Sequence, residues 1–279
     1  MWHGTRTSTA VFAATLMLFG CSDGSRATTE PAPADSTGTI YFPEAAHETR
    51  VTRNDVRIVK ATGDITAAVD EFRTLLGALN PNVNDEQPGG RREINWDGVP
   101  AALTNNELFP GNFFNVNSPR GVLFTTDGPG FRISSNGYVD VNPTYNGEFN
   151  VFSPAKLFVA VGSTVTDVAF VVAGSNVPAR VTGFGAVFAD VGRAHSTTIE
   201  YFDAAGNHLL TLAAPRRSDE TGLSFVGAVF DSGIVTRVRI RSGDTPLGAT
   251  VEDNVKGAGR KRDLAAMDDF IYGEPRASR

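Results

Sequence analysis

Two acidic segments, far apart in the chain, carry the residue types that bind hard metal ions. Asp268 and Asp269 are adjacent near the carboxyl end, and Glu93, Asn95 and Asp97 alternate within a short upstream run. Ca²⁺ binds about six to eight oxygen atoms, several of them from carboxylates. The sequence therefore predicts a structural Ca²⁺ site if the fold brings the two segments together.

The alternative for the same residues is an ordinary structural role. Successive side chains of a regular strand point to opposite faces, so only one of Asp268 and Asp269 is expected to reach the upstream segment. In the alternative, Asp268 caps a turn and Glu93 or Asp97 pairs with a nearby arginine. No EF-hand spacing in the sequence decides between the two interpretations.

Three aromatic residues are candidates for ligand binding. Trp96 lies inside the upstream acidic run, and Tyr138 and Tyr145 lie in a stretch rich in asparagine and glycine. Aromatic rings have a large apolar face that can stack on a ligand. The alternatives are a core position for Trp96 and turn packing for the two tyrosines.

The sequence offers no recognised catalytic motif. Gly-x-Ser-x-Gly, His-Glu-x-x-His and Walker sequences are absent, and His47, His195 and His208 are too scattered to nominate a zinc site. We therefore nominate no catalytic residue, and the sequence favours a binding protein over an enzyme. A glycosidase that uses two distant carboxylates remains the alternative.

The charge balance excludes one class of partner. The chain of 279 residues has 25 basic and 31 acidic residues and a net charge of −6. Nucleic-acid binding depends on clustered positive charge, so nucleic acid is not expected as a partner.

The amino-terminal segment has the pattern of an export signal. Arg6 precedes an apolar run over residues 10–20, which is shorter than the roughly 20 residues that span a membrane. The ending Leu18-Phe19-Gly20-Cys21 resembles the lipobox of bacterial lipoproteins. Cys21 is also the only cysteine of the chain.

This resemblance implies a lipid anchor. Residues 1–20 are then a lipoprotein signal peptide, and Cys21 becomes the lipid-bearing mature amino terminus. Ser22, which stands where aspartate would signal retention, implies the outer membrane. The alternatives are an ordinary cleaved signal peptide and an uncleaved segment.

The elements that must position the candidate residues follow a flexible tether. Residues 21–39 contain no large apolar residue and cannot form a packed core. Residues 40–279 are expected to form a single domain. Apolar residues at helical spacing predict an amphipathic helix near 64–79, with Asp64 as its N-cap.

Short β-strands are expected over the rest of the chain. Glycines within 181–188 are expected where another layer approaches closely. A parallel sheet needs crossover helices, which are not predicted between the strands, so we expect a mainly β, antiparallel two-sheet jelly-roll sandwich with one N-terminal amphipathic helix. The candidate strands are 121–126, 131–134, 156–161, 165–173, 180–190, 196–203, 207–213, 223–230, 234–241 and 267–272.

The carboxyl-terminal half resembles a known kind of module. The series 199–207, 225–230, 234–240 and Met267-Asp-Asp-Phe-Ile-Tyr-Gly273 is similar to jelly-roll modules of secreted bacterial proteins, related to carbohydrate-binding and galactose-binding-like domains. With residues 90–98 upstream, the chain resembles an uncharacterised family of exported bacterial proteins. The resemblance implies a glycan ligand and a Ca²⁺ near the last strand, with Asp268 and Asp269 as the matching positions.

Together these features predict a lipid-anchored protein of the bacterial cell envelope, at the outer membrane. Its β-sandwich is expected to be a non-catalytic module that binds carbohydrate or another envelope protein. Two alternatives stay open, namely a polysaccharide-acting enzyme on the same fold and a purely structural envelope protein.

Overall fold

Antiparallel strands are the main regular secondary structure in the part of the chain that the computed structural model describes. The described residues are 51–53, 56–217, 222–253 and 262–278, all within the unit Asp35–Arg279. The predicted signal peptide, Cys21 and the predicted tether lie outside these residues.

The larger sheet has nine strands in the order β1-β2-β13-β10-β15-β7-β6-β4, and β3 pairs with β15. Every pairing between these strands is antiparallel. Its strands are β1 (Val51–Arg53), β2 (Val56–Gly63), β3 (Arg91–Ile94), β4 (Asn106–Phe109), β6 (Gly130–Ser134), β7 (Leu157–Val161), β10 (Gly183–Ala189), β13 (Leu223–Phe230) and β15 (Ala266–Gly273).

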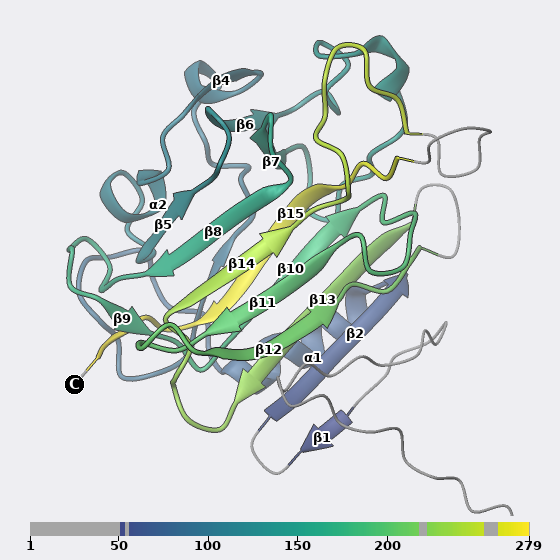
Figure 1. The fold of residues 1–279 in the computed structure, drawn as a ribbon. Helices are drawn as coiled ribbons and strands as arrows, with labels where there is room; N and C mark the ends of the chain where they lie inside the picture. The colour runs from purple at the N-terminus through teal and green to yellow at the C-terminus, as the bar shows by residue number, and fades with distance from the viewer. Residues whose placement is uncertain (1–50, 54–55, 218–221, 254–261, 279) are drawn as a thin grey trace, which may run out of the picture. The chain divides into compact units, whose positions relative to one another are not determined.

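The smaller sheet has five strands in the order β12-β11-β14-β8-β5 and stacks on the larger one (Figure 1). Its strands are β5 (Val122–Thr125), β8 (Val165–Phe170), β11 (Thr198–Phe202), β12 (His208–Ala213) and β14 (Arg237–Arg241). The shorter elements are β9 (Ala179–Arg180), which pairs with β16 (Arg276–Ala277), the helix α2 (Phe113–Val116), and the 3₁₀ turns η1 (Ala101–Leu103) and η2 (Pro143–Tyr145).

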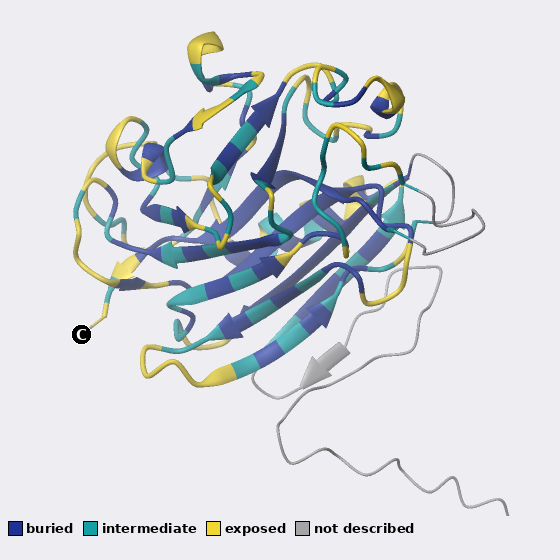
Figure 2. Cartoon of the chain, turned by 45° about the horizontal axis from the view of Figure 1, so that its top comes forward, coloured by how far each residue is buried: buried dark blue, intermediate teal, exposed yellow. Residues whose placement is uncertain are grey.

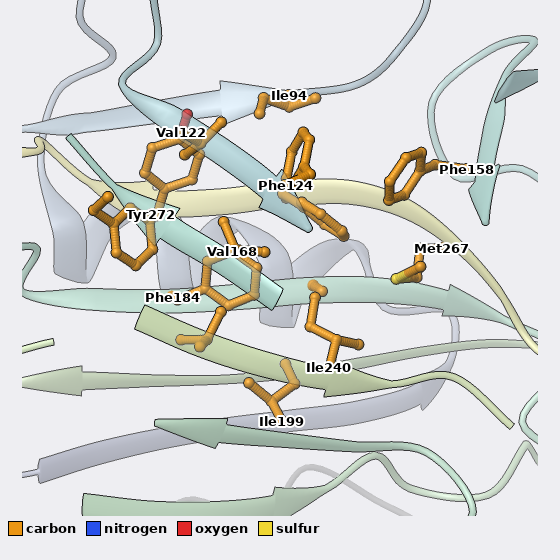
Figure 3. Packing of buried hydrophobic residues seen from close by; sticks show 14 of the residues in the cluster. Ile94, Val122, Phe124, Phe158, Val168, Phe184, Ile199, Ile240, Met267 and Tyr272 are labelled. Atoms are coloured by element: carbon orange, nitrogen blue, oxygen red, sulfur yellow. The ribbon is translucent and has the colours of Figure 1, made fainter. Parts of the chain in front are cut away.

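The main core lies between the two sheets. Alternate residues of the small sheet point inward, so its strands alternate between buried and partly exposed residues in Figure 2. Ile199 and Ile240 meet Phe184 and other residues of the large sheet in this core (Figure 3). The predicted antiparallel two-sheet sandwich is thereby confirmed.

The helix α1 (Thr66–Leu76) covers the outer face of the large sheet, against β2 and β13. The N-cap of the helix is Ile65, so the prediction of Asp64 is wrong by one residue, although Asp64 Oδ1 accepts a hydrogen bond from the Thr66 amide at 3.1 Å. The helix is shorter than predicted because Gly77, at a φ of 98°, ends it.

Two glycines allow this helix to lie close to the sheet. Gly185 and Gly227 are directly opposed on β10 and β13. A Cβ on either would lie within 2.8 Å of the ring of Phe72 in α1. The prediction that glycines within 181–188 lie where another layer approaches closely is confirmed for Gly185.

The ten candidate strands omitted β1, β2, β3, β4 and β16. Three of the four residues of β3 are charged, Arg91, Arg92 and Glu93, which local propensity does not favour in a strand. Tertiary ion pairs with other elements compensate for that local preference. Neither helix in the described ranges is long and apolar enough to cross a membrane.

Candidate functional site

A β-bulge places both acidic residues of β15 on one face. The register shifts between the pairs Ala186–Phe270 and Phe188–Met267. Val187 of β10 is therefore opposed by two residues, Asp268 and Asp269. Bulges of this kind change the direction of side chains and are frequent beside functional sites.

The packing of the neighbouring residues shows which face this is. Met267 and Phe270 belong to the core between the sheets, whereas Ala266 and Ile271 pack on the outer face. Asp268 and Asp269 lie between them and both point outward, on the side of α1. The expectation that these two carboxyls point to opposite faces is therefore wrong, because the bulge interrupts the alternation.

The two carboxyls contact the segment before β7. Ser153 Oγ lies 3.0 Å from Asp268 Oδ1 and 2.7 Å from Asp269 Oδ1. The Phe152 amide donates to Asp268 Oδ2 at 2.6 Å. Both aspartates are almost fully buried, with exposed fractions of 0 % and 3 %.

Burial changes the protonation of this pair. It raises the pKa of Asp268 to about 8, and the neighbouring charge of Asp269 adds to the rise. Burial also raises the pKa of Asp269, although the hydrogen bond from Ser153 and the charge of Arg73 oppose it. Both shifts favour a proton held within the pair near neutral pH, and the rise is large at Asp268.

The pairing of β3 with β15 brings the two acidic segments together, with Glu93 opposite Ile271. Arg73 of α1 donates to both Glu93 oxygens at 3.0 Å, and its Nη2 lies 3.7 Å from Asp269 Oδ2. Arg91 Nε donates to Glu93 Oε1 at 2.6 Å. Burial acts to raise the pKa of Glu93, but the two arginines outweigh it and the net shift is downward.

These contacts bear on the predicted Ca²⁺ site. Arg73 already supplies positive charge between Glu93 and Asp269, and the alternative pairing of Glu93 with an arginine is present. Asn95 lines the same hollow as these two acids, whereas Asp97 does not. Ca²⁺ binding by this set of residues stays a prediction, with a guanidinium competing for the position between the acids.

The three candidate aromatic residues lie in the core. Trp96 is 1 % exposed, Tyr138 0 % and Tyr145 1 %. Trp96 stacks on Phe158 at 4.1 Å between ring centroids, and its Nε1 donates to the Asp268 carbonyl at 2.7 Å. Burial to this degree favours the alternative of core and turn packing, and ligand binding by these rings stays a prediction.

Two adjoining hollows lie beside the bulge and share Asn95 and Arg120. The first, of about 350 Å³, is called the bulge hollow; it is lined by Arg73, Leu79, Asn80, Asn82, Glu93, Asn95, Arg120, Phe152, Ser153 and Asp269. The second, of about 360 Å³, is lined by Asn95, Trp96, Gly98, Pro100, Phe113, Phe114, Asn117, Ser118 and Arg120.

Sequence reasoning missed most of the bulge hollow. Arg73 was expected only as part of a helix, and Asn80, Asn82 and Arg120 were not considered as site residues. The asparagine-rich run at 80–84 was the one local signal that could have indicated a polar site. The other residues come from elements whose proximity depends on tertiary structure.

A buried ion pair fixes the rim of the bulge hollow. Arg92 donates to both carboxylate oxygens of Glu274, at 2.6 and 2.7 Å, and both side chains are at most 1 % exposed. Arg92 Nη1 also donates to the Pro81 carbonyl at 2.7 Å, and Asn80 Nδ2 donates to Glu274 Oε2 at 2.8 Å. This network holds the loop after α1 against β3 and β15.

The chain is only weakly similar to known proteins. No family model and no curated protein matches the chain. The structure of the carbohydrate-binding module TmCBM61 in complex with β-1,4-galactotriose matches with a TM-score of 0.32 and 13 % identity, over 62 % of this chain and 100 % of that one. At this TM-score the likeness assigns neither a family nor an activity.

A second solved structure is the enzymatically active domain of the bacteriophage CBA120 tailspike protein 4. It matches with a TM-score of 0.18 and 16 % identity, over 49 % of this chain and 20 % of that one. This likeness is weaker still and assigns no function.

Proposed function

We propose that this chain is a non-catalytic binding protein of the bacterial envelope, and that the bulge hollow binds carbohydrate. The observation that carries the proposal is the lining of that hollow. Carboxylate, amide and guanidinium groups stand beside the apolar side chains of Leu79 and Phe152. Sugars combine hydroxyl groups with C–H faces and need both kinds of contact.

Two amides of the hollow are available to a ligand. Asn82 and Asn95 are exposed, and within the described residues neither side chain makes a hydrogen bond. Each amide offers two donors and an acceptor in one plane, which suits neighbouring hydroxyl groups. Leu79, which is 57 % exposed, gives an apolar contact at the same hollow.

The size of the site favours a ligand longer than one sugar unit. Each hollow has the volume of a small-molecule site, about 300 Å³ or more. Because the two hollows share Asn95 and Arg120, one chain-like ligand can contact both. Asn95 then lies near the middle of the bound segment.

The arrangement of the acids favours binding over hydrolysis. A glycosidase needs a protonated carboxyl that reaches the leaving oxygen. Asp268 is the protonated carboxyl here, but it is fully buried and is held by Phe152 and Ser153. Glu93 is held in ion pairs by Arg73 and Arg91.

We expect Asn82→Ala and Asn95→Ala each to weaken glycan binding by roughly tenfold, because one hydrogen bond contributes about 1 kcal/mol. The measurement is binding to an array of oligosaccharides that includes β-1,4-galactotriose, followed by calorimetry with the best ligand. Asn176→Ala is the matched control, since Asn176 is exposed and lines neither hollow.

Three results would count against the proposal. They are the absence of any glycan ligand on the array, unchanged affinity in the Asn82→Ala/Asn95→Ala double variant, and release of reducing ends from the ligand. The last of these would support the enzyme alternative.

The envelope location has its own test. We expect Cys21→Ser to abolish lipid labelling and to release the protein from the outer-membrane fraction, because Cys21 completes the lipobox-like sequence. The measurement is metabolic labelling with a fatty acid, together with fractionation and intact mass. Unchanged membrane retention and mass in the variant would refute the lipid anchor.

A further inference from the structure

A second acidic cluster lies away from both hollows. Asp190 directly follows β10, Glu148 follows η2, and Asp253 belongs to the connection between β14 and β15. One carboxylate oxygen from each residue lies within 4.8 Å of the other two. None of the three lines the bulge hollow or the second hollow.

Asp190 is the observation that separates this cluster from ordinary surface acids. It is 1 % exposed, and neither of its carboxylate oxygens accepts a hydrogen bond from a described N–H or O–H group. Oδ1 has an ion-pair contact with Arg217 Nη2 at 2.6 Å, and the carboxyl of Glu148 lies within hydrogen-bonding reach of the Asp190 carboxyl. Two buried carboxylates that face each other repel unless a proton or a cation lies between them, which indicates that a positive group belongs there.

Three carboxylates meet at the cluster, and the guanidinium of Arg217 contacts one of them, Asp190. The nearby Asp263, by contrast, has hydrogen-bond donors for both carboxylate oxygens, because it accepts from the Gly192 amide at 2.7 Å and from Ser196 Oγ. Asp253 Oδ2 accepts from the Leu264 amide at 3.1 Å, which orients that carboxylate.

We propose that Glu148, Asp190 and Asp253 bind a divalent cation, Ca²⁺. Three oxygens within 4.8 Å of one another lie at most about 2.8 Å from a common point, so small side-chain movements bring all three to Ca²⁺–oxygen distances of about 2.3–2.6 Å. The three donors are all oxygen, which favours a hard cation over Zn²⁺, whose sites use nitrogen and sulfur.

The position gives this ion a structural role. It would join the end of β10 to two segments that have no sheet pairing there. Those segments already meet through Tyr145, whose hydroxyl donates to the Val251 carbonyl at 2.7 Å. The ion thus connects three separate parts of the chain at one end of the sandwich.

The test is calorimetric titration of the full chain with CaCl₂, and thermal unfolding in CaCl₂ or EDTA. We expect binding of one Ca²⁺. At a hundredfold excess over Kd, the melting temperature should rise by about 5–10 °C relative to EDTA. Glu148→Gln and Asp190→Asn should each weaken Ca²⁺ binding at least tenfold.

Two further variants assign the site. Asp231→Asn, at an exposed aspartate outside the cluster, should bind Ca²⁺ as the wild type does. Asp269→Asn should also retain binding, which separates this cluster from the carboxyls of the β15 bulge. Glu148 is only partly buried, so Glu148→Gln keeps the test valid if Asp190→Asn does not fold.

Several outcomes would overturn the proposal. One is the absence of Ca²⁺ binding, which would mean that the acids share a proton instead. Another is an affinity that is unchanged in Glu148→Gln. A third is an affinity that falls in Asp269→Asn alone, which would place the ion at the bulge.

Discussion

Glu274→Ala is expected to lower the free energy of unfolding by about 3–5 kcal/mol, because it leaves the buried guanidinium of Arg92 without its carboxylate. Four carbonyl groups still accept hydrogen bonds from Arg92 but do not neutralise its charge; they belong to Pro81, Val83, Asp85 and Pro119. The measurement is urea-induced unfolding at neutral pH.

Two comparisons make this result specific. The double variant Arg92→Met/Glu274→Leu should recover most of the loss, since well-packed apolar residues often replace a buried ion pair without cost. Asp231→Ala removes a partner of Arg57 from an exposed ion pair at 3.8 Å and should change stability by less than about 1 kcal/mol. Equal losses in Glu274→Ala and Asp231→Ala would contradict the role of the buried pair.

Asp268→Asn is expected to reduce the dependence of stability on pH. The folded-state pKa of Asp268 is raised to about 8, whereas an unfolded aspartate titrates near 3.8. Between these two values the folded chain holds a proton that the unfolded chain has lost. Stability from this group is therefore complete below about pH 4, falls as pH rises toward about 8, and then levels off.

The size of the effect follows from linkage. One such carboxyl lowers the free energy of unfolding by about 1.4 kcal/mol per pH unit within that window. Asn keeps the shape of the protonated acid, and its carbonyl can still accept from the Phe152 amide. The variant should therefore be more stable than the wild type at pH 8 and should differ much less at pH 4.

The measurement is urea unfolding at several pH values from 4 to 9. Asp231→Asn is the control for removing a negative charge and should leave the pH slope near that of the wild type, because its carboxylate is exposed. Parallel pH curves for the wild type and Asp268→Asn would mean that Asp268 is ionised in the folded chain at neutral pH.

Much of the fold was predictable because alternation is a local property. In β11 and β12, Ile199, Tyr201, Leu210 and Leu212 recur at every second position, and all four are buried between the sheets. The helix was predictable for the same reason, since its apolar residues recur at helical spacing within one short segment. Strands rich in charge, such as β3, were missed because their stability comes from partners in other elements.

The candidate site, unlike the fold, was predictable only in part from local patterns. Position in the sequence indicated that Glu93 and the Asp268–Asp269 pair could meet, and the pairing of β3 with β15 brings them together. The direction of Asp268 was not predictable, because a bulge exists only as a mismatch with the partner strand β10. The burial of Trp96 was likewise decided by Phe158, a residue more than sixty positions away.

The sequence by itself therefore determined the class of fold, the helix and the residues that could carry chemistry. Hydrophobic periodicity and residue type are properties of short segments, so they can be recognised without knowing which other element packs against the segment. Only the tertiary structure decided which acids face one hollow, where Arg73 neutralises them, and which asparagines stay free. Those outcomes depend on register and on contacts between distant segments, because proximity and burial set the electrostatics of each group.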